Sequence, residues 1–492
     1  MIFRLPFVLG SKCFKRICSA PNRLKKKVSK RHGQHFAHCL FLIAFVSSFV
    51  WFSLRTLNDE HANDFDPFER YGVFIAIFLY FCRMIPLLAL PNVLFNLAGQ
   101  IRYCIFSEPV VQLSLMPPNP PHMRIRVVTR GDFPDLVKRN VSRNVSTCVS
   151  AGIPNFAVEV VTDNAISISP LSSHPTVRLR EIVVPPSYKP KSGALFKARA
   201  LQYCLENGVN QLDDDDWIVH LDEETVMTEN AARGIFNFIV NGKAKIGQGV
   251  ITYANEEIVS WITTLADLVR VAEDVGKYKF QFKNFEKPLF GMKGSYVVTQ
   301  VATERAVSFD NGKDGSVAED CYFALIASAK GVKFGFIEGE MWEKSPFSFY
   351  DFLQQRKRWI QGISLVVHSS KVPMSVKFLL ALNLYVWICL PLCTSNIVLA
   401  GIAPVPLHPV VSFLLALVGA GNLYMYPCGF FRAFPVKRLG IFRAVACLCG
   451  LVLVIPMNVI VENIAVIWGI FGYKYKFYVV KKEPISQVLV QV

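Results

Sequence analysis

Three short groups of acidic, basic and aromatic residues in the middle of the chain have the types and spacing needed for chemistry on a charged substrate. The first group follows Trp217–Leu221, a short apolar run with a β-branched centre that is typical of a buried parallel strand. Asp222, Glu223 and Glu224 come directly after it, at the edge where open α/β sheets place their ligands. Neighbouring acids repel one another unless a cation compensates them. Asp222 and Glu224 are therefore predicted to hold a divalent metal ion and, with it, a phosphorylated donor.

A simpler interpretation competes with the metal site. Acids after a strand can form a solvated loop that caps a helix beginning near Thr225 or Thr228. A second acidic run, Asp213–Asp216, contains the same spacing twice, but it precedes the strand and so falls at the opposite edge of the sheet. We expect that run to be a solvated turn.

Two further acids lie where predicted elements begin or end. Asp163 follows the strand predicted over Ala157–Thr162 and can accept hydrogen bonds from the base or ribose of a nucleotide. It can equally form a helix cap or an Asx-turn with Asn164. Asp320 precedes the helix predicted over Cys321–Lys330, where a carboxylate can take a proton from an attacking hydroxyl. The alternative for Asp320 is an acid that only complements the helix dipole.

The most specific stretch of the sequence is the run QRKRW at positions 355–359. On a helix predicted over Ser348–Gly362, Gln355, Arg358 and Trp359 share one face. A planar cation suits phosphate oxygens and an indole suits stacking on a pyranose ring, so these three side chains are predicted to bind a sugar diphosphate. A basic helix that binds anionic lipid beside a membrane is the alternative.

These groups must be positioned by a domain in which strands and helices alternate. Strands are predicted over Arg124–Thr129, Ala157–Thr162, Val177–Val184, Trp217–Leu221, Ala244–Val250 and Val332–Ile337, with a strand pair in Pro288–Thr299. Helices are predicted over Asp135–Ser150, Ala194–Glu206, Glu229–Val240, Trp261–Val275, Cys321–Lys330 and Ser348–Gly362. This alternation predicts an α/β fold with a mostly parallel sheet.

Both ends of the chain are apolar enough to suggest a membrane protein. Candidate spans are Ala37–Leu54, Tyr71–Phe95, Val376–Gly401, Val410–Tyr426 and Ala444–Phe471. The last carries Pro456 and Glu462, which fits either one tilted helix or a broken pair. A cleaved signal peptide would also explain the first span, but the basic region before it is too long, so we expect a retained anchor.

The charge distribution orients these spans. The chain has a net charge of +16, and residues 1–35 contain ten Lys or Arg and no acid. Basic residues beside an apolar span indicate the cytosolic side of a membrane and not a nucleic-acid-binding face, so no nucleic-acid partner is expected. The predicted organisation is a basic cytosolic tail (1–36), two membrane spans (37–95), a Pro-rich linker (96–122), a catalytic domain (123–347), an amphipathic interface helix (348–375), C-terminal spans (376–471) and a basic tail (472–492).

The motifs, in their order along the chain, resemble glycosyltransferase family 2. They are Asp163, the Asp222-x-Glu224 pair, Ala318-Glu319-Asp320 and the Q-x-x-R-W of Gln355–Trp359, followed by membrane spans. HLDEET, VAEDCYFAL and FLQQRKRWIQG, together with the two leading spans, are similar in detail to the egghead-type β-1,4-mannosyltransferases of invertebrate glycosphingolipid synthesis. Three positions depart from the wider family: Glu224 stands in place of Asp, Ala318 in place of Thr, and the TRGD loop at 129–132 is unusual.

The resemblance implies a GT-A-like fold set between N- and C-terminal membrane helices, and an inverting, metal-dependent transfer of mannose from GDP-mannose to glucosylceramide in the bilayer. It assigns nucleotide binding to Asp163, Mn²⁺ or Mg²⁺ binding to Asp222 and Glu224, the catalytic base to Asp320, and the donor or acceptor site to Gln355, Arg358 and Trp359. A multi-pass protein of the ER or Golgi with a cytosolic catalytic domain is expected. In that case the sequons at Asn140 and Asn144 stay unglycosylated.

Two other functions remain open from the sequence. A processive polysaccharide synthase of the same family would use the same motifs but would extrude a long product. A membrane transporter with a cytosolic domain would use Arg83 and Glu462, the charges within apolar spans.

Overall fold

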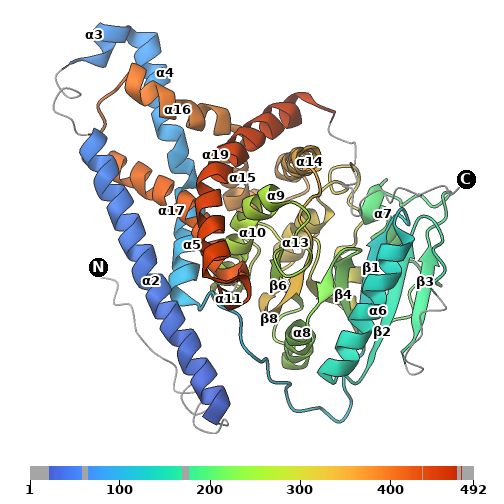
Figure 1. Cartoon of the computed structure of the whole chain (residues 1–492). Helices are drawn as coiled ribbons and strands as arrows, with labels where there is room; N and C mark the ends of the chain where they lie inside the picture. Colours follow the sequence, from blue (N-terminus) through green and yellow to red (C-terminus); the bar gives the residue numbers. More distant parts are fainter. Residues whose placement is uncertain (1–21, 58–64, 169–176, 435, 474–477, 479–492) are drawn as a thin grey trace, which may run out of the picture.

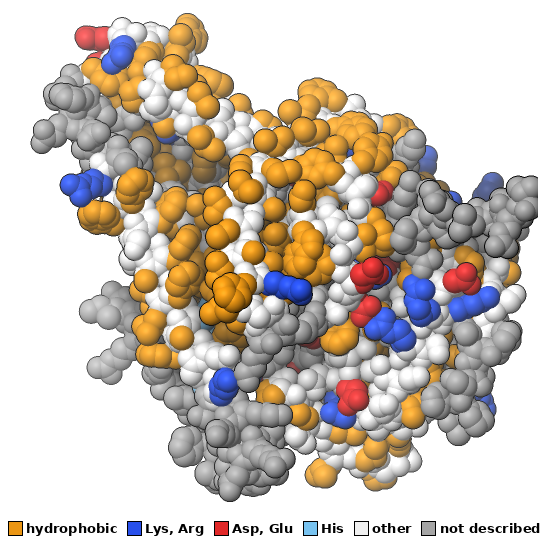
Figure 2. Space-filling view, in the orientation of Figure 1, with side chains coloured by type: hydrophobic (Ala, Val, Ile, Leu, Met, Phe, Trp, Pro, Cys, Tyr) orange, Lys and Arg blue, Asp and Glu red, His pale blue; other side chains and the backbone are white. Residues whose placement is uncertain are grey.

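The computed structural model describes residues 22–57, 65–168, 177–434, 436–473 and 478. An α/β domain forms one side of the molecule, and helices from both ends of the chain form the other (Figure 1). Figure 2 shows hydrophobic side chains gathered over the terminal helices, whereas most of the Lys, Arg, Asp and Glu side chains in that view lie over the α/β domain. The expected α/β domain between apolar helical ends is therefore confirmed.

The α/β domain is built on one eight-stranded sheet with the order β3-β2-β1-β4-β7-β6-β8-β5. The strands are β1 (Met123–Thr129), β2 (Phe156–Thr162), β3 (Leu179–Val183), β4 (Trp217–Asp222), β5 (Val226–Met227), β6 (Ile246–Thr252), β7 (Val297–Gln300) and β8 (Phe334–Trp342). β3, β2, β1 and β4 are mutually parallel, but β7 runs antiparallel to both of its neighbours and β5 antiparallel to β8, so the sheet is mixed.

In the described part of the chain, seven helices flank the sheet; five of them fall where helices are predicted, whereas α11 and α12 are not predicted. They are α6 (Pro134–Ala151), α7 (Phe196–Tyr203), α8 (Glu229–Asn241), α11 (Lys279–Asn284), α12 (Val301–Val307), α13 (Glu319–Ala329) and α14 (Phe349–His368). α8 begins at an N-cap, where the Thr228 side chain accepts a hydrogen bond from the Ala231 backbone N–H. All of Trp217–Leu221 is buried, as expected for a strand covered on both faces.

Two predicted elements are wrong. Pro288–Thr299 is not a strand pair: its only strand residues are the first three of β7, Val297–Thr299, and Gly291 before them has a φ of +84°, which ends any extended run. Trp261–Val275 is not one helix but α9 (Trp261–Ala266), α10 (Leu268–Glu273) and the start of a π-helical turn, η4 (Asp274–Tyr278). The break falls at Asp267, whose carboxylate is held by Arg356 of α14 at 2.7 Å.

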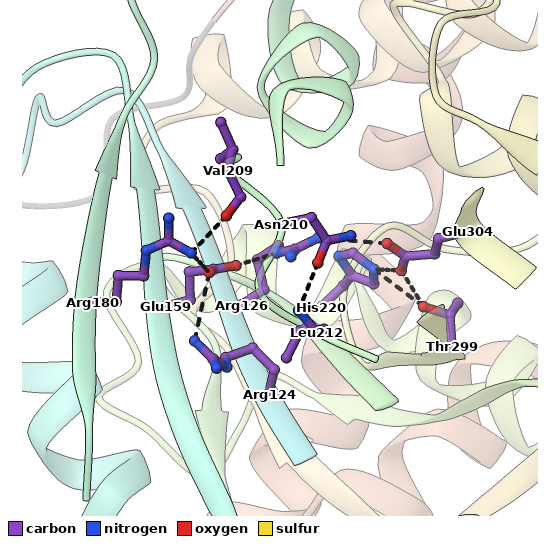
Figure 3. A network of polar contacts seen from close by, with 10 residues as sticks. All are labelled: Arg124, Arg126, Glu159, Arg180, Val209, Asn210, Leu212, His220, Thr299 and Glu304. Atoms are coloured by element: carbon purple, nitrogen blue, oxygen red, sulfur yellow. Dashed lines mark hydrogen bonds and ion pairs between the residues drawn. The ribbon is translucent and has the colours of Figure 1, made fainter. Parts of the chain in front are cut away.

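A buried network of charges joins the parallel strands (Figure 3). Arg126 of β1 lies in register between Glu159 of β2 and His220 of β4. Its Nε donates to Glu159 Oε2 at 2.7 Å, and its Nη1 lies 3.5 Å from Glu304 Oε2. Glu304 also bonds to His220, and Arg180 of β3 pairs with Glu159. Because these charges are largely enclosed by protein, the network ties four strands and α12 into one arrangement.

The Arg126→Met substitution should destabilise the domain strongly. It keeps an apolar side chain of similar length but leaves Glu159 and Glu304 without their shared cation, at a cost of about 3–5 kcal/mol. The control is Arg305→Met, which breaks an exposed ion pair with Asp214 worth at most about 1 kcal/mol. Denaturant unfolding of the purified proteins in detergent measures both effects. Equal losses in the two variants would contradict the structural role of the network.

The terminal helices agree with the predicted spans in number but not in their ends. They are α2 (Asn22–Leu57), α3 (Pro67–Tyr71), α4 (Val73–Met84), η2 (Ile85–Ala89), α5 (Leu90–Arg102), α15 (Met374–Ile388), α16 (Leu390–Ile402), α17 (Pro409–Ala433), α18 (Val436–Leu439) and α19 (Ile441–Phe471). Among the described residues, four helices are long and apolar enough to cross a membrane, or five if α15 and α16, bent by 52°, count as one span.

Helix boundaries correct two predicted segments. Residues 22–36, which the prediction places in the basic tail, are helical and belong to α2; residues 1–21 lie outside the described part of the chain. Residues 96–102 belong to α5 and not to the linker, because Asn96 accepts a hydrogen bond from the Lys277 backbone N–H and packs against η4. Of the predicted tail 472–492, only three residues, 472, 473 and 478, are described.

α19 is one continuous helix, and it lies along the α/β domain. Near its start, Ala444, Cys447 and Leu451 share a hydrophobic cluster with Leu265 of α9. At its end, Gln361 of α14 donates a hydrogen bond to the Gly469 carbonyl at 3.1 Å. Large hydrophobic side chains are exposed along its outer face: Phe442, Val445, Val452, Leu453, Ile460, Ile464, Ile467 and Phe471. The broken-pair alternative is wrong, and both ends of this helix contact the same domain.

Candidate active site

A cavity of about 1320 Å³ opens at the carboxyl ends of β1, β2 and β4. All seven residues singled out from the sequence line it: Asp163, Asp222, Glu224, Asp320, Gln355, Arg358 and Trp359. Residues almost two hundred positions apart in the chain therefore meet in one place. Their individual roles stay predictions. The second acidic run, Asp213–Asp216, forms a turn before β4 and does not line the cavity, as expected.

The three acids at the end of β4 all line the cavity, but the middle one is also tied into the interior. Asp222 is the last residue of the strand, and both it and Glu224 line the cavity. Glu223, between them, is buried and receives hydrogen bonds from Thr129 Oγ1, through its side chain, and from Asn140 Nδ2, through its carbonyl. The helix-capping alternative is right about the helix, which begins after Thr228, but the loop before it is not fully solvated, because Glu223 is part of the packed interior.

Lys197 of α7 is a site residue that the sequence did not reveal. Its Nζ donates to Asp222 Oδ1 at 2.5 Å and to the Gly294 carbonyl at 3.1 Å, and it lies 3.7 Å from Glu319 Oε1. Burial lowers the pKa of this amine, but the Asp222 and Glu319 carboxylates raise the pKa by more than burial lowers it. The pKa of Lys197 therefore lies above its usual value. The only sequence signal was a lysine in a small, mostly apolar helix.

Acids outnumber cations around this position. Glu343, after β8, accepts a hydrogen bond from Thr225 Oγ1 at 2.6 Å. Burial raises the pKa of Glu343 to about 7, with a further contribution from Glu224 and Asp222. Carboxylate oxygens in excess over neighbouring cations are a suitable donor set for Mn²⁺ or Mg²⁺. Asp222 and Glu224 are the residues that would hold the ion. The Lys197 ammonium pairs with Asp222 in the structure.

Asp320 lies at the second position of α13, and its side chain faces the cavity. One oxygen accepts a hydrogen bond from the Cys321 N–H at 2.7 Å. Gly294 allows the other oxygen to lie close, because a Cβ there would be 2.9 Å from Oδ2. Protein surrounds the cavity on most sides, so burial raises the pKa of Asp320 to about 7, and the Glu319 carboxylate adds to the shift. A carboxylate with this pKa is suited to proton transfer near neutral pH.

Asp163 lies at the rim of the cavity, just after β2. Its carboxylate pairs with Arg199 at 3.0 Å, and its side chain is 43% exposed. The neighbouring Asn164 N–H bonds to Thr162 Oγ1 and the Asn164 side chain to the Arg130 carbonyl. The turn is therefore held by other residues, and the Asp163 carboxylate is at a position that a nucleotide can reach.

α14 contributes three of the predicted residues to the cavity. Gln355, Arg358 and Trp359 line the cavity, as predicted from their spacing. Gln355 Oε1 is buried and has no hydrogen-bond partner among the described residues. The guanidinium groups of Arg270 and Arg356 lie 4.6 Å and 4.5 Å from the centre of the Trp359 ring. These contacts fix the indole in one orientation within the cavity.

Comparison with known proteins identifies the family. Residues 217–431 match the family model described as "Glycosyl transferase family group 2". The chain is 56% identical over 451 residues to the β-1,4-mannosyltransferase egh of Drosophila melanogaster, covering 92% of this chain and 97% of that protein. It is 52% identical over 452 residues to bre-3 of Caenorhabditis elegans, also a β-1,4-mannosyltransferase, covering 92% and 98%. The chain belongs to the egghead-type β-1,4-mannosyltransferases of glycosyltransferase family 2.

Solved structures are similar to this glycosyltransferase only at a distance. Residues 1–349 of Staphylococcus aureus TarS superpose with a TM-score of 0.35 and 11% identity, covering 74% of this chain and 95% of that one. Mannosyl-3-phosphoglycerate synthase from Rubrobacter xylanophilus gives a TM-score of 0.32 and 10% identity, covering 52% and 77%.

Family membership makes the protein a glycosyltransferase, so the transporter alternative is set aside.

In this glycosyltransferase, the Asp320→Asn substitution should stabilise the fold, and more so at high pH. The folded-state pKa of Asp320, about 7, lies above that of an exposed aspartate. Folding therefore becomes less favourable as the pH rises from the pKa of an exposed aspartate to about 7. Asparagine removes the titration and with it the penalty. The gain in unfolding temperature should be larger at pH 8 than at pH 5. Asp213→Asn, in the turn before β4, serves as control; a gain that does not depend on pH would contradict the prediction.

Proposed function

We propose that this enzyme transfers one mannose from GDP-mannose to glucosylceramide in β-1,4 linkage, with inversion at the anomeric carbon. The observation that carries the proposal is the single cavity in which the sheet-edge carboxylates and the Q-x-x-R-W side chains meet helices apolar enough to cross a membrane. The relatives in Drosophila melanogaster and Caenorhabditis elegans are β-1,4-mannosyltransferases, which supports the sugar and the linkage. A ceramide acceptor stays in the bilayer, because each buried CH₂ contributes about 0.8 kcal/mol.

The reaction is a single displacement at the anomeric carbon of the donor. Asp320 accepts the proton of the acceptor hydroxyl, whose oxygen attacks that carbon from the face opposite the diphosphate. The bond from the anomeric carbon to the diphosphate oxygen breaks, GDP leaves, and the α-linked sugar becomes β-linked. Arg358 and Lys197 supply positive charge where the leaving group develops negative charge. Mn²⁺ or Mg²⁺, when bound at Asp222 and Glu224, supplies further charge neutralisation.

Single addition is favoured over a processive synthase. Two of the candidate spans are not straight helices that could line a wide pore along their whole length. The pair α15 and α16 is bent by 52°, and α19 contacts the α/β domain at both ends. The remaining helices, α2, α4 to α5 and α17, are few for a channel that extrudes a growing chain.

The location that fits best is a multi-pass protein of the ER or Golgi with the α/β domain in the cytosol. The donor GDP-mannose is then taken up from the cytosolic side. With α2, α4 to α5, α15 to α16 and α17 as four crossings, the α/β domain and both ends of α19 fall on the same side as the basic N-terminal segment.

The test of the function is a transfer assay with the purified full chain, GDP-mannose and glucosylceramide in detergent micelles. The wild type should add one hexose to the lipid, removal of divalent cations with EDTA should abolish transfer, and Mn²⁺ or Mg²⁺ should restore it. Asp320→Asn should reduce the turnover at least about 10²-fold, because it lacks the base, while GDP-mannose binding survives.

Mass spectrometry of the product and calorimetric titration of the donor measure these effects. A ladder of long chains would replace this function with polysaccharide synthesis. Near-normal turnover of Asp320→Asn would refute the assignment of the base. Glu257→Gln, at an acid that lines the cavity but pairs with Lys344 at its edge, is the control and should keep wild-type turnover.

The orientation in the membrane needs engineered glycosylation sites, because the natural sequons are buried. Asn140 and Asn144 are 5% and 2% exposed, and Asn144 accepts a hydrogen bond from the Met227 N–H. Their lack of glycans would therefore say nothing about the side of the membrane. A sequon inserted in the exposed turn at Asp213–Asp216 should stay unmodified in cells, whereas the same sequon in segment 58–64 should be glycosylated. Glycans on the Asp213–Asp216 insertion would place the domain in the lumen.

A further inference from the structure

The cavity continues past α14 to the helices from both ends of the chain. The wall there is formed by apolar side chains of η2, α15, α16, α17 and α19: Ala89, Val386, Leu390, Leu423, Ile455 and Val459. Most of these helices are the ones apolar enough to cross a membrane. We call this part, together with the polar residues described next, the membrane-side chamber.

Polar side chains interrupt this apolar wall. They are Asn92 of α5, Asn383 and Trp387 of α15, Asn422 and Tyr426 of α17, and Asn458 and Glu462 of α19. A helix that lies against lipid tails does not keep such groups without a use, because an unsatisfied polar group is costly in apolar surroundings. Side chains from four separate elements converge here, so the chamber is a built site and not a chance exposure.

Two carbonyl oxygens in the cavity have no partner. Asn458 donates through Nδ2 to the Tyr426 hydroxyl at 2.8 Å, but its Oδ1 is buried and unpaired among the described residues. Gln355 Oε1, on the α14 side of the same cavity, is also buried and unpaired there. Both atoms can only accept hydrogen bonds, so a ligand that satisfies them must carry donors such as hydroxyl groups.

The charges in the chamber are already balanced. Glu462 Oε1 lies 3.1 Å from Arg356 Nε, and Glu462 Oε2 accepts a hydrogen bond from Trp387 Nε1 at 2.9 Å. Arg356 is held in addition by Asp267 at 2.7 Å. No cation of this set is left to bind a phosphate, which argues against an anionic headgroup. The Glu462 contact instead fixes the indole of Trp387 at the cavity wall.

We propose that the membrane-side chamber binds the sugar headgroup of a neutral glycolipid. Asn458 Oδ1 and Gln355 Oε1 accept hydrogen bonds from sugar hydroxyls, and the Trp387 indole packs on the apolar face of the pyranose ring. The lipid chains run along the apolar wall. This inference rests on the proposed function for the acceptor class, and it adds where that acceptor lies and which residues of the terminal helices recognise it.

The test compares two asparagines on α19. Asn458→Leu removes the unpaired acceptor at nearly constant volume and should raise the KM for glucosylceramide about 5-fold, the loss expected for one neutral hydrogen bond, with the KM for GDP-mannose unchanged. Asn463→Leu is the control: Asn463 bonds to the Val459 carbonyl and to Thr394 and does not line the cavity, so both KM values should stay at wild type. Unfolding temperatures verify that both variants are folded.

A second measurement does not depend on turnover. Glucosylceramide with a photoreactive group on its sugar should label α15 or α19 of the wild type, and Asn458→Leu should reduce the label. An unchanged acceptor KM together with unchanged labelling would refute the chamber as the headgroup site while the transfer itself stands. Labelling of α19 without any mannose transfer would instead refute the proposed function and leave the glycolipid site in place.

Discussion

One buried ammonium group holds the catalytic edge of the sheet together. Asp222, Glu224, Glu319, Asp320 and Glu343 all face the same cavity; burial raises the pKa values of Asp320 and Glu343, and repulsion from the neighbouring carboxylates raises them further. Lys197 reduces that repulsion by contacting the two acids at the ends of β4 and at the start of α13. Arg358, on the facing helix α14, is a second cation close enough to interact with these acids.

The same edge explains why much of the site could be predicted. Asp222 and Asp320 each follow a local pattern, an apolar strand or the start of a helix, and the carboxyl ends of parallel strands meet at one edge whatever the rest of the chain does. The spacing in Gln355–Trp359 is likewise a property of one helix. Local periodicity and strand direction were sufficient to predict that these residues lie at the cavity. The order of the same motifs along the chain was sufficient to suggest the family.

Contacts between distant segments could not be predicted in this way. Lys197 enters the site because α7 packs against β1 and β2 and its Nζ reaches Asp222, and Glu343 because the end of β8 lies beside Thr225. The break at Asp267 arises from Arg356, and the course of α19 along the α/β domain arises from Leu265 and Gln361. None of these partners is near in sequence. By length and composition α19 is a candidate membrane span, but hydropathy reports only that a face is apolar and not which elements it packs against.

α14 connects the two halves of the molecule. One side of it carries Gln355, Arg358 and Trp359 toward the sheet edge, while Arg356 reaches Glu462 on α19. A displacement of α19 would therefore act on the indole of Trp359 through the adjacent guanidinium of Arg356. The ion pair between Arg356 and Glu462 thus links an apolar terminal helix to the cavity wall.

The hydrophobic interior of the α/β domain extends without interruption into α17 and α19, since Val219 and Leu221 of β4 belong to the same buried cluster as Phe430, Ala444 and Val461. A shortened protein ending after α14 would expose that cluster to water. We therefore expect a fragment cut at the apparent domain border to aggregate, and the helical half to be needed for a folded recombinant protein.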